Sequence, residues 1–325
     1  MTLAGVVGHA RAVARLARMA DEARVPGAVL LAGPPGIGKY TLARAFAARL
    51  LCEGVVSGDA CGTCAQCVRL AAGTHPDLHV VAREEERRDV RIEQVRDLVR
   101  WLGLQPLMAQ RKVAVVDDAH CLSVPAQNAL LKTLEEPPGA SVIVLVAAGA
   151  GLLLPTIRSR CQIVRLEPLA SDDVVAVLTA RGVEPGEARA LAAIADGSPG
   201  RALTLADDRE SRAQLLGALA RLPTLAAHEL SEVAQKVART RVEEALDAAV
   251  AWYRGLLKTT LLGDPPPAGD VAAMSLSPAL RLRQLEAVCD TLGALERNAN
   301  RTLALETLLF RLREIERNAP GADDA

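Results

Sequence analysis

A glycine-rich loop near the N-terminus constrains the fold more than any other stretch of this chain. It lies between an apolar run, Ala28 to Leu31, and a segment with helical apolar spacing, Thr41 to Leu51, and it reads Gly33-Pro34-Pro35-Gly36-Ile37-Gly38-Lys39-Tyr40-Thr41. Glycines let backbone N–H groups turn inward around an anion, the following helix directs its positive end to the same place, and Lys39 adds a full charge. The sequence therefore predicts a strand, a phosphate-binding loop and a helix in succession.

The position after the lysine departs from the usual pattern of such loops. A Ser or Thr there holds Mg²⁺ through its hydroxyl, but this chain has Tyr40. A phenol is too long to place its oxygen at roughly 2.1 Å from a magnesium seated by the loop, and Thr41 comes one residue late, a rotation of about 100° on a helix. We expect a phosphate cradle with a defective magnesium ligand, and the sequence leaves open whether ATP binds there.

Composition limits what can surround this loop. The chain has 325 residues, of which 50% are hydrophobic and 2% aromatic, and a formal net charge of −1. The hydrophobic fraction is sufficient for a buried core. The net charge excludes an overall basic surface, so any nucleic-acid contact must be a local patch or be shared with partners. No apolar run is long enough to span a membrane and no export pattern opens the chain, so we expect a cytoplasmic protein without membrane contact.

Four cysteines follow the loop closely, with the spacing C-x8-C-x2-C-x2-C: Cys52, Cys61, Cys64 and Cys67. Four thiolates so near in sequence predict a closed, tetrahedral, structural zinc site. An iron–sulfur run is the weaker alternative, because it would need a further cysteine and a proline just beyond Cys67. The isolated cysteines 121, 161 and 289 are interpreted as small core residues.

A second apolar run, from Lys112 to Val116, ends in two acids. A buried strand of this kind presents a carboxylate beside the phosphates, and Asp117 is the candidate on the metal side. Asp118 stands where a water-activating Glu is usual, and it is one methylene shorter, which weakens general-base reach. Alone, the segment would fit a strand ending in a polar turn; with the glycine loop, it predicts a degenerate second half of a nucleotide site.

Two further strings carry a family resemblance. The first is Ala126-Gln127-Asn128-Ala129-Leu130-Leu131-Lys132-Thr133-Leu134-Glu135-Glu136-Pro137-Pro138, and the second is Leu154-Pro155-Thr156-Ile157-Arg158-Ser159-Arg160-Cys161. With the cysteine module, they resemble the bacterial DNA polymerase III clamp-loader family of AAA+ proteins, in particular its delta-prime branch. The resemblance covers Val6 to about Gln162.

The resemblance implies a subunit of a hetero-pentamer, with gamma/tau and delta subunits as partners, that opens a sliding clamp and leaves it on primed DNA. Arg160, in the Ser-Arg-Cys motif, would act as an arginine finger on the neighbouring subunit's ATP; the alternative is a surface ion pair. Arg201 lies where the family has its second sensor, and it could equally be an ordinary arginine of a first helical turn.

Departures from the motor subunits of the family favour a stator. Tyr40 replaces the magnesium ligand, Asp118 replaces the base, and an apolar Val146-Ala147-Ala148 occupies the place of the polar first sensor. We therefore expect a delta-prime-type subunit with weak or no ATPase activity of its own, and keep an ATP-hydrolysing gamma/tau-type motor as the alternative.

The resemblance also implies three parts. We predict an α/β P-loop (AAA+) domain with a parallel sheet at residues 1–166, with the zinc module inserted at 52–67. A small helical lid at 167–207 and an all-α collar at 208–318, broken by a proline-rich loop at 263–269, would follow. The polar residues 319–325 are expected to be a disordered tail.

Overall fold

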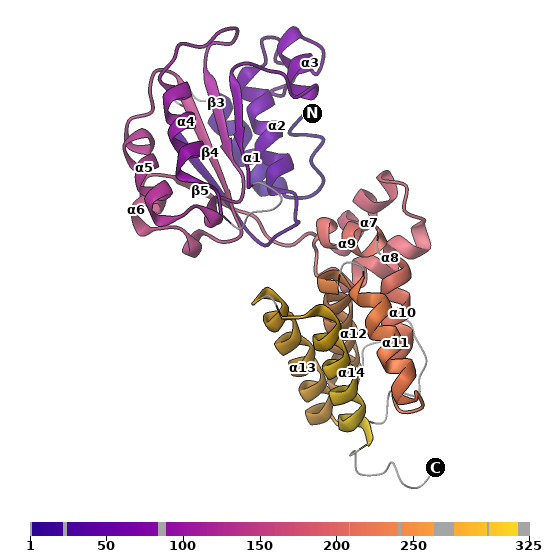
Figure 1. Ribbon diagram of the computed structural model, residues 1–325. Coiled ribbons are helices and arrows are strands. Elements are labelled where there is room, and N and C mark those ends of the chain that lie inside the picture. Colours follow the sequence, from indigo (N-terminus) through magenta and orange to yellow (C-terminus); the bar gives the residue numbers. More distant parts are fainter. Residues whose placement is uncertain are drawn as a thin grey trace. The chain divides into compact units, whose positions relative to one another are not determined.

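The computed structural model describes residues 2–21, 25–83, 89–207, 209–239, 242–262, 276–297 and 299–317 (Figure 1). They belong to two compact units, one formed by Met1–Val177 with Gly197–Gly200 and the other by Leu178–Asp196 with Arg201–Ala325. The predicted proline-rich loop and the predicted disordered tail lie outside the described residues. The predicted domain boundaries at 166 and 207 stay predictions.

The first unit is built on a five-stranded parallel sheet with the order β2-β3-β4-β1-β5. Its strands are β1 (Ala28–Ala32), β2 (Leu78–Val81), β3 (Lys112–Val116), β4 (Ser141–Ala147) and β5 (Gln162–Arg165). Every residue of β1, β3 and β4 is buried. Apolar runs without alternation are what a parallel sheet covered on both faces requires, and the predicted sheet is confirmed.

Helices cover both faces of this sheet. One face carries α4, α5 and α6, and the other carries α1 and α2 (Figure 1). The helices of this unit are α1 (Ala10–Asp21), α2 (Lys39–Leu51), α3 (Ala65–Ala71), α4 (Ile92–Leu102), α5 (Val124–Glu135) and α6 (Pro155–Arg158). Short 3₁₀ turns lie at Ala119–Cys121 and Ala150–Leu152. The motifs lie where the sequence predicts, because α2 begins at Lys39 and α5 ends just before the double proline.

The second unit is entirely helical in its described part. The boundary between the two units falls inside two helices, α7 (Ser171–Ala180) and α9 (Pro199–Asp207). The others are α8 (Pro185–Ile194), α10 (Arg209–Ala220), α11 (Ala227–Ala238), α12 (Val242–Leu262), α13 (Pro278–Glu296) and α14 (Arg301–Arg317). No helix within the described ranges is both long and apolar enough to cross a lipid bilayer.

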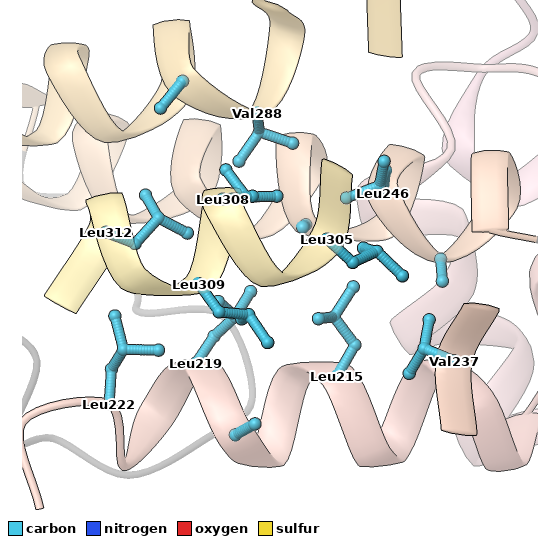
Figure 2. Close-up of a cluster of buried hydrophobic side chains, with 14 of the residues drawn as sticks. Leu215, Leu219, Leu222, Val237, Leu246, Val288, Leu305, Leu308, Leu309 and Leu312 are labelled. Carbon is cyan, nitrogen blue, oxygen red and sulfur yellow. The ribbon is translucent and has the colours of Figure 1, made fainter. Parts of the chain in front are cut away.

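Leucine and valine side chains from five helices meet in the core of the helical unit. Leu215 and Leu219 of α10 face Leu305 and Leu309 of α14, while Val288 of α13 approaches from the other side (Figure 2). All five side chains are fully or almost fully buried. At about 25 cal/mol per Å² of apolar surface removed from water, such a cluster is sufficient to stabilise a helical bundle.

The isolated cysteines differ from their predicted role. Cys289 of α13 is exposed, and Cys121 and Cys161 are only half-buried. The prediction of a core position is therefore wrong for Cys289. An isolated cysteine carries no periodic signal, and apolar neighbours on a helix fix its side of the helix only when the surrounding pattern is strongly amphipathic.

Candidate functional site

The glycine loop connects the buried end of β1 to the first turn of α2. Gly36 and Gly38 adopt left-handed backbone conformations, with φ of 72° and 94°, which residues with a Cβ adopt only at a cost. Gly33 is required for a different reason, because a Cβ there would lie 2.3 Å from the carbonyl oxygen of Leu166. The predicted strand, loop and helix are present, and two of the glycines shape the turn that a phosphate would require.

The loop lysine is held inside its own loop. Lys39 is 8% exposed, and its Nζ donates to the carbonyl oxygen of Pro34 at 2.5 Å. Burial lowers the pKa of this amine, and the nearby carboxylates of Asp117 and Asp118 act in the opposite direction. The fold thus brings together the lysine and the two acids that the sequence assigns to one site.

The two acids follow β3 in a sharp turn. The backbone N–H of Asp117 donates to the carbonyl of Val81 at 2.8 Å, and burial raises the pKa of its carboxyl. Asp118 adopts a left-handed conformation with φ of 45°, and its Oδ2 lies 3.9 Å from Nε of Arg83. Asp117 is therefore held by the sheet with its carboxyl partly removed from water, whereas Asp118 is directed to a surface ion pair.

The two hydroxyl-bearing residues at the start of α2 are Tyr40 and Thr41. Tyr40 is half-buried and Thr41 is exposed. Neither hydroxyl makes a hydrogen bond to any part of the chain that the structure describes. At the end of β4, Ala147 accepts a 3.2 Å hydrogen bond from Gly33 N–H, and its methyl side chain offers no polar group. The phosphate-type loop is formed, and the roles of Tyr40, Thr41 and Asp118 toward a metal stay predictions.

Three residues that sequence reasoning did not assign to the loop contact it. His9 Nε2 lies 2.7 Å from the carbonyl oxygen of Ile37, and Ser198 Oγ donates to the carbonyl of Pro35 at 3.0 Å. Gly200 N–H donates to the carbonyl of Gly36 at 2.8 Å. A Cβ on Gly200 would lie 2.8 Å from Cα of Gly36. The only sequence signal was the pair of Gly-containing turns at 8–9 and 197–200.

The predicted arginine finger lies at the end of α6. Nε of Arg160 donates to Oε1 of Glu135 at 2.6 Å, and its Nη1 donates to the carbonyl of Thr156 at 3.0 Å. The arginine side chain is 32% exposed and that of Glu135 48% exposed. An ion pair at such exposure contributes about 0–1 kcal/mol. Arg160 is held at the surface by a contact that another anion can replace.

Arg201 lies at the start of the helical unit's share of α9. Its Nη1 lies 3.1 Å from Oδ2 of Asp196, and its Nη2 donates to the carbonyl of Asp247 at 3.0 Å. Asp196 also pairs with Arg254 at 2.5 Å. The role of Arg201 as a second sensor stays a prediction.

The four predicted zinc ligands come together. Their Sγ atoms all lie within 4.8 Å of one another, with Cys52 and Cys61 at 3.6 Å and Cys61 and Cys67 at 4.0 Å. Four sulfurs bonded to one zinc at about 2.3 Å are roughly 3.8 Å apart. The donor set and its spacing therefore fit a tetrahedral metal ion.

Backbone donors support these sulfurs as thiolates. The N–H of Cys64 donates to Sγ of Cys61 at 3.3 Å, and the N–H of Cys61 donates to Sγ of Cys52 at 3.3 Å. Backbone donors, first Thr63 and then Cys64, lower the pKa of the Cys61 thiol to about 6, whereas burial raises that of Cys67 to about 12. A bound cation would offset this burial cost, because metal ligation favours the thiolate.

An acid missed by sequence reasoning anchors the loop beside the cysteine module. Asp77 is fully buried and accepts hydrogen bonds from three backbone N–H groups, those of Leu107, Met108 and Ala109, at 2.7, 2.7 and 2.8 Å. The Met108 carbonyl in turn accepts from Gln66 of the module at 3.2 Å. The turn at His75-Pro76-Asp77 is thus connected by hydrogen bonds, through the loop at 107–109, to the cysteine module.

The fold and the site together define a class. A phosphate-type loop after β1 and acids after β3 lie at the carboxyl edge of a parallel sheet, where α/β proteins bind ligands, and the chain continues into helices. The same fold occurs in a DNA polymerase III gamma subunit-related protein from Thermotoga maritima. That protein aligns with a TM-score of 0.50 and 18% identity over 94% of this chain and 99% of its own. The class is the P-loop AAA+ fold with a helical C-terminal part.

Sequence relatives narrow the class to a family. The model of the family described as "DNA polymerase III, delta subunit" matches residues 8–170. The DNA polymerase III subunit delta' of Pseudomonas aeruginosa is 39% identical over 254 residues, which are 76% of each chain. That of Escherichia coli is 37% identical over 197 residues, 59% of each chain. The chain belongs to the DNA polymerase III clamp-loader family, in its delta-prime branch.

Proposed function

We propose that this protein is a non-motor subunit of a DNA polymerase III clamp loader, which helps to place a sliding clamp on primed DNA during replication. In this role it assembles with gamma/tau and delta subunits and works in the cytoplasm. Its contribution to ATP hydrolysis is Arg160, supplied to the nucleotide of a neighbouring subunit. The delta-prime relatives support the assembly, and the site geometry supports the division of labour.

The residues at two positions carry the proposal: Tyr40 stands where a motor subunit has a Ser or Thr for the metal, and Asp118 where it has a Glu. Asp118 also pairs with Arg83. Arg160 lies at the surface, where it pairs with the exposed carboxylate of Glu135 and donates to the carbonyl of Thr156. An arginine supplied in trans is worth roughly 10³–10⁵ in rate in related nucleotide hydrolases. A subunit with such a residue can be essential to turnover without hydrolysing ATP itself.

The four-cysteine cluster has a structural role in this proposal. We infer that it holds zinc, because four sulfur donors leave no open coordination position for substrate or water. Its place between α2 and β2 lets it fix the chain that returns from the loop helix to the edge strand. Zinc would supply local rigidity and no chemistry at the phosphate loop.

The alternative is a gamma/tau-type motor that hydrolyses ATP at its own loop, with Tyr40 or Thr41 holding the metal through water. This alternative stays open because the loop lysine, Lys39, is present and buried in its loop, and because the carboxyl of Asp117, whose pKa is raised by burial, follows β3. ATP with Mg²⁺ could use the cradle of Gly33, Gly36 and Gly38, so nucleotide binding alone does not distinguish the two functions. Turnover does.

The test is clamp- and primed-DNA-stimulated ATP hydrolysis by the reconstituted assembly, with substitutions in this chain alone. We expect Arg160→Ala to lower turnover at the affected site by about 10³-fold and Lys39→Ala to change the rate less than twofold. Arg189→Ala, an exposed arginine of α8, is the matched control. A collapse of turnover with Lys39→Ala and a normal rate with Arg160→Ala would establish the motor and refute the stator.

A further inference from the structure

Helix α1 carries a row of arginines that neither the core nor the nucleotide-type site uses. Arg11, Arg15 and Arg18 are exposed and follow one another at intervals of four and three residues, which places them on one side of a helix. The buried face of α1, formed by Ala12, Leu16 and Met19, lies about 100° further round the helix. The row therefore flanks the buried face and remains exposed along its length.

A fourth arginine joins the row from the edge of the sheet. β5 is an edge strand, and Arg11 and Arg15 line a hollow of about 330 Å³ with Arg165 of that strand. A second hollow of about 420 Å³ is lined by Arg11, Arg15 and Arg18 together with Gln162. The two hollows share two arginines and so form one shallow, elongated basic groove between α1 and β5.

The described residues supply no ion-pair partner to the arginines of the groove. No carboxylate within the described ranges lies within ion-pairing distance of these four guanidinium groups. The only acid of α1, Asp21, is paired with Arg49 of α2. Because the whole chain has a net charge of −1, this concentration does not reflect a generally basic protein. Like charges one turn apart cost a helix about 0.2–0.5 kcal/mol each, so the row opposes helix stability unless an anion binds it.

The shape and chemistry of the groove favour a phosphodiester backbone as that anion. Guanidinium forks match phosphate oxygens and remain charged at every physiological pH. From Arg11 to Arg18 the helix rises by about 10 Å, close to three steps of about 3.4 Å along one DNA strand. No aromatic side chain lines either hollow, which argues against base stacking and for sequence-independent contact.

We propose that the α1–β5 groove, formed by Arg11, Arg15, Arg18 and Arg165, binds the phosphate backbone of duplex DNA. The contact belongs to this chain itself and is separate from the phosphate loop. It does not depend on whether Arg160 acts on a neighbour. It adds to the proposed function a surface through which this subunit itself binds DNA.

The test is a salt titration of binding with the isolated full-length chain and a short fluorescein-labelled DNA duplex, followed by anisotropy. Non-specific binding in the range of about 10⁻⁴–10⁻⁶ M is expected for the unchanged protein. Replacing Arg11, Arg15 and Arg18 by Gln should weaken binding at least tenfold and reduce the slope of log K against log salt by about 3. Replacing the same three by Lys should keep most of the slope.

The matched control replaces Arg181, Arg189 and Arg221 by Gln, three exposed arginines of the helical unit, and changes the net charge equally. An equal loss of binding in this control would overturn the proposal, since charge alone would explain both results. Binding that is unchanged in the α1 variant would also overturn it. Poly-glutamate that competes as well as unlabelled duplex would assign the groove to an acidic protein partner instead. Circular dichroism verifies that each variant is folded.

Discussion

The cysteine module and the phosphate loop are neighbours along the chain, and they differ in completeness. The module has all four donors, and its sulfurs lie within 4.8 Å of one another. The loop keeps its glycines and Lys39 but has Tyr40 at the position where a Ser or Thr usually holds the metal. A structural metal needs every ligand for its folding energy, whereas a phosphate loop can lose its metal side and still serve as a turn.

This difference shows how to interpret the glycines of the loop. Gly33 is required by its close approach to the Leu166 carbonyl, and Gly36 by its φ of 72°. Both requirements hold without nucleotide. The glycine pattern therefore indicates that a phosphate-type fold is maintained, and the residues at Tyr40 and Asp118 decide what the fold can catalyse.

The largest expected effect is loss of the metal. We expect Cys64→Ser, or removal of the metal by a strong chelator, to lower the free energy of unfolding by more than about 4 kcal/mol, because autonomous zinc modules gain about 10–16 kcal/mol from the ion. Metal content and thermal unfolding measure this. Cys289→Ser, at an exposed cysteine, should change neither. An unchanged melting temperature after verified metal removal would show that the metal does not stabilise the cysteine module.

Next in size is the buried acid that supports the module. Asp77→Asn should cost about 3 kcal/mol, since three N–H groups lose a carboxylate acceptor. Burial raises the pKa of Asp77, but the three backbone donors outweigh it, so the pKa lies below its model-peptide value of 3.8. A depressed carboxyl pKa stabilises the folded protein fully above that value.

The pH dependence gives this second prediction a distinct signature. The contribution of Asp77 should disappear as the pH falls below about 4 and through its folded pKa. Chemical unfolding of the two proteins should therefore give free energies that converge at low pH and differ most near neutrality. A constant difference across that range would show that the cost of Asp77→Asn has another origin.

A smaller effect separates the two kinds of loop glycine. Gly33→Ala should cost about 2–3 kcal/mol, because the new methyl meets backbone 2.3 Å away. Gly38→Ala has open space around it and only the positive φ of 94°, so about 1 kcal/mol is expected. Denaturant unfolding measures both. A larger loss of stability for Gly38→Ala than for Gly33→Ala would mean that the positive φ of the turn constrains the loop more than the close contact with the Leu166 carbonyl does.

The smallest effect concerns the pair that restrains Arg160. Glu135→Gln should change stability by less than about 1 kcal/mol, because the ion pair with Arg160 lies at the surface in contact with solvent. If the pair competes with a neighbour's nucleotide, turnover of the assembly should stay equal or rise. A turnover as low as that of Arg160→Ala would show that Glu135 positions the arginine for its task.

Local patterns were enough to predict much of the fold. The strand, loop and helix around Lys39 follow from glycine spacing, and β3 follows from an apolar run ending at Asp117. The four cysteines are close in sequence, so their meeting in space needs no long-range information. In each case the residues that define the feature lie within about one element of one another.

Features that join distant parts of the chain were not predicted. The contact of Ser198 with Pro35 spans 163 residues, and the groove between α1 and β5 needs the position of Arg165 beside Arg11. The arginine row itself was visible in the sequence, but the buried side of the helix explained the segment well enough without it. Asp77 shows the same limit, because its three donors come from a loop 30 residues further on.

The link from Ser198 and Gly200 back to the glycine loop has a consequence for biosynthesis. The α/β unit is discontinuous, since residues 178–196 belong to the helical unit and Gly197–Gly200 to the first. As the chain leaves the ribosome from its N-terminus, the sheet can form early, but the carbonyls of Pro35 and Gly36 receive their donors only after helix α8 of the second unit has been synthesised. The nascent protein must therefore keep an unfinished glycine loop until late in translation.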